Sequence, residues 1–274
     1  MTHAPIKLST RNLCKEFRKG AATIEAVRAV SIDVRDGEFI SVVGASGCGK
    51  TTFLRLVDGL ISPTSGTISI DGKPVKKPGE KLAFVFQQDG LLPWRTVLDN
   101  TLFGPEIRGG KKAESLATAR GFLKLVGLTG FDTHYPHELS GGMRQRVNLA
   151  RALTAGADVL LMDEPFAALD AQTRTIMQGE LMRICRETRK TVLLVTHQID
   201  EAVYLSDRVL VFTTRPGRLK EEILINLPRP RDLAVKFSAE FGRHCDHIWR
   251  LIEEEVRASM GLELQSAAGT HQMN

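Results

Sequence analysis

The fold of this chain is decided by residues 39–51, which read FISVVGASGCGKT. The first five residues are mostly apolar, which predicts a buried strand over Phe39–Val43. The next eight match the pattern G-x-x-x-x-G-K-S/T, and a helical pattern continues from Thr51 to about Leu60. A strand, a glycine-rich turn and a helix in this order place backbone N–H groups and a helix N-terminus around a bound phosphate. We therefore predict a phosphate-binding loop at residues 44–51.

Nine consecutive residues are expected to contact a nucleotide: Gly44, Ala45, Ser46, Gly47, Cys48, Gly49, Lys50, Thr51 and Thr52. Lys50 would reach the β- and γ-phosphates, and the hydroxyl of Thr51 would bind Mg²⁺. Cys48 lies at the helix N-terminus beside this lysine, so we expect its thiol to be partly ionised. The alternative is a glycine-rich turn that occurs by chance, and the flanking strand and helix disfavour it.

Residues 159–164 read VLLMDE, so that two carboxylates follow four apolar residues. A strand at 159–162 would deliver Asp163 to the phosphate end of the sheet, where it could hold Mg²⁺ directly or through water. Glu164 would then be placed to polarise an attacking water molecule. Taken alone, the segment could also be a strand that merely ends in a charged turn. The phosphate loop elsewhere in the chain favours the catalytic interpretation.

Short apolar runs alternate with helical patterns along the chain. Further runs at 82–86, 192–195 and 209–212 are compatible with buried parallel strands, and helical patterns at 171–189 and 199–205 separate them. This alternation predicts an α/β fold. Elsewhere the patterns predict a hairpin strand at 67–70, a mostly helical region at 99–153, an edge strand at 221–227, a helix at 233–260 and a disordered tail from residue 265.

The composition of the 274 residues is that of an ordinary globular protein, with 42% hydrophobic and 25% charged residues, and this balance excludes wholesale disorder. No apolar run approaches the ~18 residues that cross a bilayer, and Met1–Thr10 lacks the layout of an export signal. We therefore expect neither a membrane span nor export. The net charge of +5 is compatible with a nucleotide, a nucleic acid or an anionic membrane and favours none of them.

Residues 139–146 read LSGGMRQR. Ser140 has the chemistry of an N-cap, and Gly141 and Gly142 at a helix start expose backbone donors suited to a phosphate. The spacing does not tell whose phosphate they would bind. In its order after the phosphate loop and before the Asp-Glu pair, the segment resembles the signature of the ATPase subunits of ABC transporters. That resemblance implies a P-loop NTPase (RecA-like) core with an antiparallel β subdomain and an α-helical signature subdomain.

Four further positions resemble this family in order. Phe17 resembles the aromatic residue that stacks on adenine, and Gln87 the glutamine that senses Mg²⁺ and water and links to the membrane subunit. Asp170 resembles the D-loop aspartate, and His197 the switch histidine at the γ-phosphate. Taken alone, Phe17 could be a core residue and His197 a hydrogen-bonded histidine at a strand end. The resemblance implies catalytic roles for Glu164, His197 and Gln87, nucleotide contacts for Phe17, Ser140, Gly141, Gly142 and Asp170, and magnesium binding by Thr51, Gln87 and Asp163.

The resemblance also implies a domain organisation and an assembly. Residues 6–230 would form the ATP-binding domain, with the helical subdomain at about 88–155, and residues 231–274 a C-terminal helix and a flexible tail. In this family two cassettes form a head-to-tail dimer, with ATP between the phosphate loop of one and the signature of the other. Since the chain holds one copy of each motif, a second copy of itself or a related subunit is expected. Only 96 positions separate Gly44 from Ser140, which disfavours the coiled-coil insertion of chromosome-maintenance and repair relatives.

Two short segments, LLPWRTV at 91–97 and LPRPR at 227–231, resemble the importer ATPases for nitrate, sulfonate and taurine, whose relatives also serve bicarbonate and pyrimidine precursors. Such a subunit is peripheral, on the cytoplasmic face of the inner membrane, and uses ATP and Mg²⁺. It drives import of a small solute through a separate permease, which a periplasmic or extracellular solute-binding protein feeds, and no nucleic acid takes part. Trp94 would then lie on the groove that receives a helix of the permease, unless it is an ordinary core aromatic. The alternatives are a soluble P-loop kinase, half of an exporter and an ABC regulator without a transport role.

Overall fold

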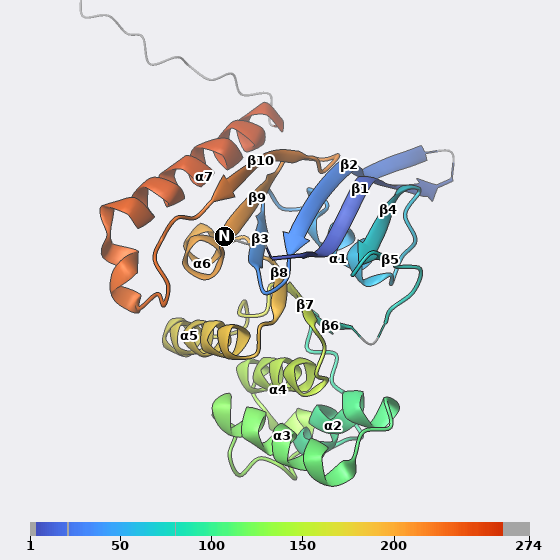
Figure 1. The fold of residues 1–274 in the computed structure, drawn as a ribbon, viewed down its shortest axis with the longest axis vertical. Coiled ribbons are helices and arrows are strands. Elements are labelled where there is room, and N and C mark those ends of the chain that lie inside the picture. The colour runs from blue at the N-terminus through green and yellow to red at the C-terminus, as the bar shows by residue number, and fades with distance from the viewer. Residues whose placement is uncertain (1–3, 21, 80, 260–274) are drawn as a thin grey trace, which may run out of the picture.

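The structure is a computed structural model that describes residues 4–20, 22–79 and 81–259. Its centre is a six-stranded sheet with the strand order β10-β9-β3-β8-β7-β6 (Figure 1). All neighbouring strands are parallel except β10, which pairs antiparallel with β9. The strands are β3 (Phe39–Val43), β6 (Leu82–Val85), β7 (Val159–Asp163), β8 (Thr191–Val195), β9 (Arg208–Phe212) and β10 (Leu219–Leu224). The predicted α/β fold is therefore confirmed, and the edge strand begins two residues before its predicted start.

The central sheet separates two apolar cores, and its side chains alternate between them. On β7, for example, Leu160 and Met162 belong to the core under α4 and α5, whereas Val159 and Leu161 belong to the core under α1. All five residues of β3, of β7 and of β8 are buried. A parallel sheet covered on both faces has this property, which explains why its strands are recognisable as unbroken apolar runs.

A second, antiparallel sheet covers α1 on one side of the molecule, with the order β2-β1-β4-β5 (Figure 1). Its strands are β1 (Ile6–Lys19), β2 (Ala22–Arg35), β4 (Ser65–Ile70) and β5 (Lys73–Pro74). The sequence patterns did not predict the two longest strands, β1 and β2. Register shifts interrupt their pairing at several points between Ile6 and Glu16, so the polar–apolar alternation that marks a strand is broken.

The predicted helical region consists of α2 (Val97–Ile107), α3 (Lys112–Leu125) and α4 (Gly141–Thr154), which gather at the lower end of Figure 1. Helix α4 packs against both α2 and α3 and also contacts β6. It therefore connects the helical region to the central sheet, at the strand that precedes Gln87.

The remaining helices are α1 (Lys50–Asp58), α5 (Ala171–Glu187), α6 (Ile199–Leu205) and α7 (Ala239–Ser259). The single helix predicted at 233–260 is wrong in its first turn. Leu233–Phe237 is a 3₁₀ turn, and α7 starts anew after Ser238, whose hydroxyl accepts a hydrogen bond from the N–H of Phe241. The predicted disordered tail lies outside the described residues. Within the described part of the chain, no helix is long and apolar enough to span a membrane.

Candidate functional site

The phosphate loop occupies residues 44–49, between the end of β3 and the start of α1. Gly47 and Gly49 have φ angles of 73° and 109°, in the left-handed region that favours glycine. A Cβ on Gly49 would lie 2.3 Å from the carbonyl oxygen of Ala26, so the neighbouring strand also excludes a side chain there. No side chain caps the N-terminus of α1. Its N–H groups are thus available to a phosphate.

Lys50 points back into the loop. Its Nζ donates hydrogen bonds to the carbonyl oxygens of Gly44, at 2.8 Å, and Ala45, at 2.9 Å. Lys50 is only 7% exposed, and these two hydrogen bonds hold its ammonium group close to the loop backbone. The loop thus has a positive charge at the wall of the cavity in which a phosphate would bind.

The expectation that the thiol of Cys48 is partly ionised is wrong. The residue is 1% exposed, and burial raises the pKa of its thiol. Lys50, whose Nζ lies 3.8 Å from the sulfur, lowers the pKa by less than burial raises it. The sequence places the thiol at a helix N-terminus but does not show that the side chain points into the core.

The first carboxylate after β7 lies against the loop. The hydroxyl of Thr51 donates a hydrogen bond of 3.0 Å to Oδ1 of Asp163. Asp163 is 4% exposed, and burial raises its pKa, although the bond from Thr51 opposes this. A hydroxyl and a buried carboxylate side by side are the oxygen ligands that Mg²⁺ prefers, and a divalent cation would stabilise the charged form of Asp163. The residues present therefore fit a magnesium ion.

The second carboxylate, Glu164, lies between two polar side chains. Nε2 of Gln87 donates a 3.2 Å hydrogen bond to its Oε2, and Nδ1 of His197 lies 3.1 Å from its Oε1. These three residues follow β6, β7 and β8, and the carboxyl ends of adjacent parallel strands meet at one edge of a sheet. The topology explains why residues separated by more than a hundred positions come together.

A cavity of about 280 Å³ lies over the phosphate loop. Its lining includes eight of the residues singled out in the sequence, namely Ser46, Gly47, Gly49, Lys50, Thr51, Thr52, Gln87 and Glu164. The other expected nucleotide contacts are absent from the described lining: Gly44, Ala45 and Cys48 of the loop, and Phe17, Ser140, Gly141, Gly142 and Asp170 elsewhere. One chain thus brings together the phosphate loop, the carboxylates and the glutamine, but not the signature or the aromatic residue.

The residues outside the cavity occupy defined places. Phe17 is on β1, 42% exposed, with the ammonium of Lys15 at 5.2 Å from its ring centre. Ser140 caps α4 by accepting a hydrogen bond from the N–H of Met143. Asp170 likewise caps α5. The glycines of the signature therefore lie at the start of α4, outside the described lining of the cavity over their own phosphate loop.

Two residues that line the cavity, Ala26 and Arg215, were missed from the sequence. Arg215, which follows β9, donates from Nε and Nη2 to the carbonyl oxygen of Gly47, at 3.3 and 3.1 Å, and lines the cavity. The N–H of Gly217 donates to the carbonyl oxygen of Ala26, which fixes this segment beside the loop. The sequence shows a turn at 215–218 but nothing that relates it to a loop 168 positions earlier.

Comparison with known proteins gives consistent results. The sequence profile described as "ABC transporter" matches residues 27–167. The uncharacterised ABC transporter ATP-binding protein MJ0412 of Methanocaldococcus jannaschii is 50% identical over 93% of this chain and 94% of its own length. The nitrate import ATP-binding protein NrtD of Synechocystis is 42% identical, over 89% and 94%. The taurine import ATP-binding protein TauB of Roseobacter denitrificans is also 42% identical, over 91% and 96%.

Solved structures show the same fold. The dimeric post-hydrolysis structure of the ATP-binding cassette MJ0796, bound to ADP and Pi, superposes with a TM-score of 0.73 at 32% identity. The match covers 81% of this chain and all of that one. The P-loop NTPase fold predicted from the loop and the signature is thereby confirmed. The chain belongs to the ABC transporter family, as an ATP-binding cassette whose ATPase activity is coupled to transport.

Proposed function

We propose that this cassette drives the import of a small anion or sulfonate, such as nitrate or taurine, through a separate permease supplied by a solute-binding protein. The support is the 42% identity to proteins named for nitrate import and taurine import over about nine-tenths of the chain. The same names disfavour an exporter half and a regulator without a transport role. Bicarbonate and pyrimidine precursors remain the alternative substrates. The chain would act at the cytoplasmic face of the membrane, with residues 6–230 as the ATP-binding domain.

The observation that carries the proposed chemistry is the arrangement of Glu164 beside the Thr51–Asp163 pair. The loop N–H groups and Lys50 would hold the β- and γ-phosphates. Thr51 and Asp163 would bind Mg²⁺, which when bound neutralises charge on the phosphate oxygens. Glu164 would accept the proton of the attacking water molecule. Gln87 and His197 contact its two carboxylate oxygens and would hold them in position.

A second copy of the chain would complete the site. The signature lies outside the described lining of its own chain's cavity, at the glycine start of α4, where Ser140 is the N-cap. In a head-to-tail dimer this helix start would donate its N–H groups to the γ-phosphate on the partner's loop. A Cβ on Gly142 would lie 3.4 Å from the carbonyl oxygen of Ala168, so the two backbone segments are close, and the N–H of Ala167 donates to the carbonyl oxygen of Glu164. A short backbone path would thus connect the signature to the catalytic carboxylate.

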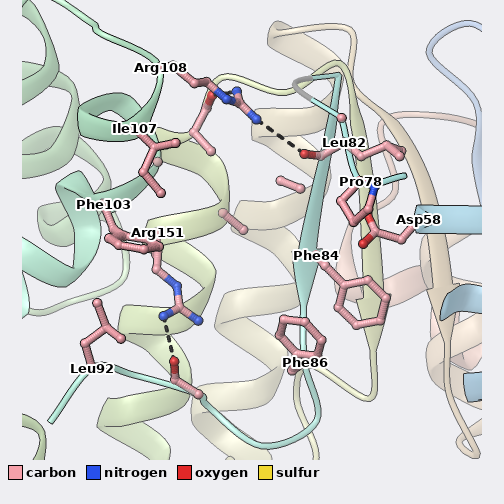
Figure 2. A pocket seen from close by; sticks show the side chains of 16 residues that line it. Asp58, Pro78, Leu82, Phe84, Phe86, Leu92, Phe103, Ile107, Arg108 and Arg151 are labelled. Atoms are coloured by element: carbon pink, nitrogen blue, oxygen red, sulfur yellow. Dashed lines mark hydrogen bonds between the residues drawn. The ribbon is translucent and has the colours of Figure 1, made fainter. Parts of the chain in front are cut away.

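The permease would dock between the central sheet and the helical region. A cavity of about 560 Å³ opens there, and Figure 2 shows it with Phe86 at one end of β6 and Leu92 across from it. The carbonyl oxygen of Phe86 accepts hydrogen bonds from Gln145 and Asn148 of α4. Since Gln87 is the next residue, a helix pressed into this cavity would act on the glutamine that contacts Glu164.

Trp94 supports the same location from outside the cavity. Its side chain is 72% exposed, which excludes the core position that the sequence left open. It lies on the segment that also carries Leu92, although it does not line the cavity itself. An exposed tryptophan beside an apolar cavity is typical of a protein interface.

Reconstitution tests the proposal. Proteoliposomes that hold the cassette, its permease and its solute-binding protein should take up isotopically labelled nitrate or taurine only when Mg-ATP is present on the cassette side. The Lys50→Ala variant serves as the control without nucleotide binding. If the proteoliposomes take up bicarbonate or a pyrimidine precursor but neither nitrate nor taurine, the proposed substrate is wrong. No permease-dependent uptake of any solute would contradict the importer assignment.

A further inference from the structure

The cavity between β6 and the helices α2 and α4 is mostly apolar. In Figure 2, Leu92, Phe103 and Ile107 lie on one side, and Phe84 and Phe86 on the other. Ile107 is 70% exposed, so this wall opens to the outside. The cavity has a volume of about 560 Å³, which gives room for several side chains from one face of an inserted helix.

Two arginines also line the cavity, and both direct their donors at backbone carbonyl groups. Nη2 of Arg108 donates to Leu82 at 3.4 Å (Figure 2). Nη1 and Nη2 of Arg151 donate to Gly90 at 2.9 Å and Asp89 at 3.0 Å. These bonds join the helical region to the segment around β6. The two guanidinium groups therefore hydrogen-bond to the backbone that lines the cavity and do not pair with the acidic side chain in it.

Asp58 is the one acidic side chain in the described lining. It is 5% exposed, and no hydrogen bond or ion pair joins its carboxylate to any residue that the structure describes. It is also the last residue of α1, at the negative end of the helix dipole. Burial raises the pKa of this carboxyl group to about 6. The carboxylate thus borders the cavity with little exposure and without a donor from the described residues, so a basic group that enters the cavity would find an unpaired acceptor.

We propose that Asp58 pairs with a lysine or arginine carried by the permease helix that enters this cavity. The inference rests on the proposed function, which supplies the permease as the occupant. Charge complementarity selects the basic residue, because the arginines of the cavity are bonded to carbonyl groups and Asp58 has no donor. A helix without a basic residue at this position would bury the carboxylate unpaired. Asp58 therefore selects among permeases as well as adding affinity.

The test uses the full-length tagged cassette and the membrane subunit that co-purifies with it, identified by mass spectrometry. Binding of the two purified proteins is measured for the wild type, Asp58→Asn, Asp58→Lys and Asp58→Leu. We expect at least tenfold weaker binding for Asp58→Asn and none for Asp58→Lys, with the permease-free ATPase activity of each variant unchanged. Replacing one basic residue in a cytoplasmic helix of the permease with glutamate should restore the binding of Asp58→Lys to within threefold of the wild type.

Asp246→Asn, an exposed carboxylate on α7, is the matched control and should bind as the wild type does. Wild-type affinity for Asp58→Asn overturns the inference, as does a charge-exchange series in which no replacement restores Asp58→Lys. Tighter binding by Asp58→Leu would show that the occupant presents an apolar group, which also contradicts it. A wild-type cassette that retains no membrane protein with several spans would overturn the proposed function instead, and this inference with it. The unchanged ATPase activity shows that a loss of binding is not a loss of folding.

Discussion

At the scale of single residues, Glu164 illustrates how the backbone supplies a reactive position. Its φ of 49° is unusual for a residue other than glycine, and its N–H donates to the carbonyl oxygen of Val195 at 2.9 Å. The bond ties the end of β7 to the end of β8, so the carboxylate turns toward Gln87 and His197. Backbone strain of this kind is kept where function requires it. The sequence predicts Glu164 as the base, but not this conformation, which depends on the pairing of two strands.

Replacing Glu164 with glutamine should separate binding from hydrolysis. The amide keeps the shape of the side chain but cannot accept a proton, so we expect turnover to fall at least about 100-fold while ATP affinity stays within threefold. Phosphate release and binding of a fluorescent ATP analogue measure the two quantities. The Lys50→Ala variant should lose binding itself. Wild-type turnover in Glu164→Gln would show that another group is the base.

Asp58 should make the stability of the isolated chain dependent on pH. Because its folded-state pKa of about 6 is above the ordinary value of 3.8, its ionised form disfavours the folded state. The free energy of unfolding should therefore fall as the pH rises from about 4 to about 6 and then remain level. Asp58→Asn removes this titration, so we expect it to be more stable than the wild type at pH 8, by up to about 3 kcal/mol, with the gain absent near pH 4. Urea unfolding at both pH values measures it. An equal difference at both would contradict the assignment.

At the scale of elements, the parallel strands were predictable, as were the antiparallel strands β4 and β10, whereas β1 and β2 were not. The strands β3, β7 and β8 are buried on both faces, so their apolar runs stand out in the sequence. On β1 and β2 the register shifts and one solvent-facing side remove that signal. Helix α7 was misplaced by one turn because Ser238 caps it, a role that the periodicity of the flanking residues conceals. The cavity that holds Asp58 is formed by α1, α2, α4 and β6 together, so no local pattern predicts it.

The segment after β9 is an element whose role appears only in three dimensions. Arg215 bonds to the carbonyl oxygen of Gly47, and we expect it to hold the phosphate loop in its binding conformation. Arg215→Ala should raise the dissociation constant for ATP about three- to tenfold, since a hydrogen bond from a charged donor is lost at an exposed position. Arg218→Ala, an exposed arginine in the same turn, is the control and should bind ATP as the wild type does. Equal affinities of the two variants would assign Arg215 no role in nucleotide binding.

At the scale of the whole molecule, the predicted nucleotide contacts of one chain do not all meet at one cavity. Six residues of the phosphate loop and the start of α1 line one cavity together with Gln87 and Glu164. Ser140, Gly141 and Gly142 are at the start of α4 and do not belong to the described lining of that cavity. The motifs of one chain therefore predicted most residues that line this cavity, but not Ala26 or Arg215, which only the fold brings to it. The relative MJ0796, which is 32% identical to this chain, was solved as a dimer bound to ADP and Pi. A site divided between two chains is consistent with that dimer.

The most direct test is a mixture of two defective cassettes, both in the Glu164→Gln background so that bound ATP persists. One carries Lys50→Ala and the other Ser140→Arg, and neither should dimerise alone. In their mixed dimer the intact loop of one chain faces the intact signature of the other, so one site is whole. A matched control places both substitutions in one chain and mixes it with a chain that has neither, which leaves a lesion in each of the two mixed sites. The ATP-dependent dimer of differently tagged chains is measured by size-exclusion chromatography. We predict mixed dimers from the first pair and none from the second, whereas equal amounts from both pairs, or none from either despite subunit exchange, would contradict a site shared head to tail.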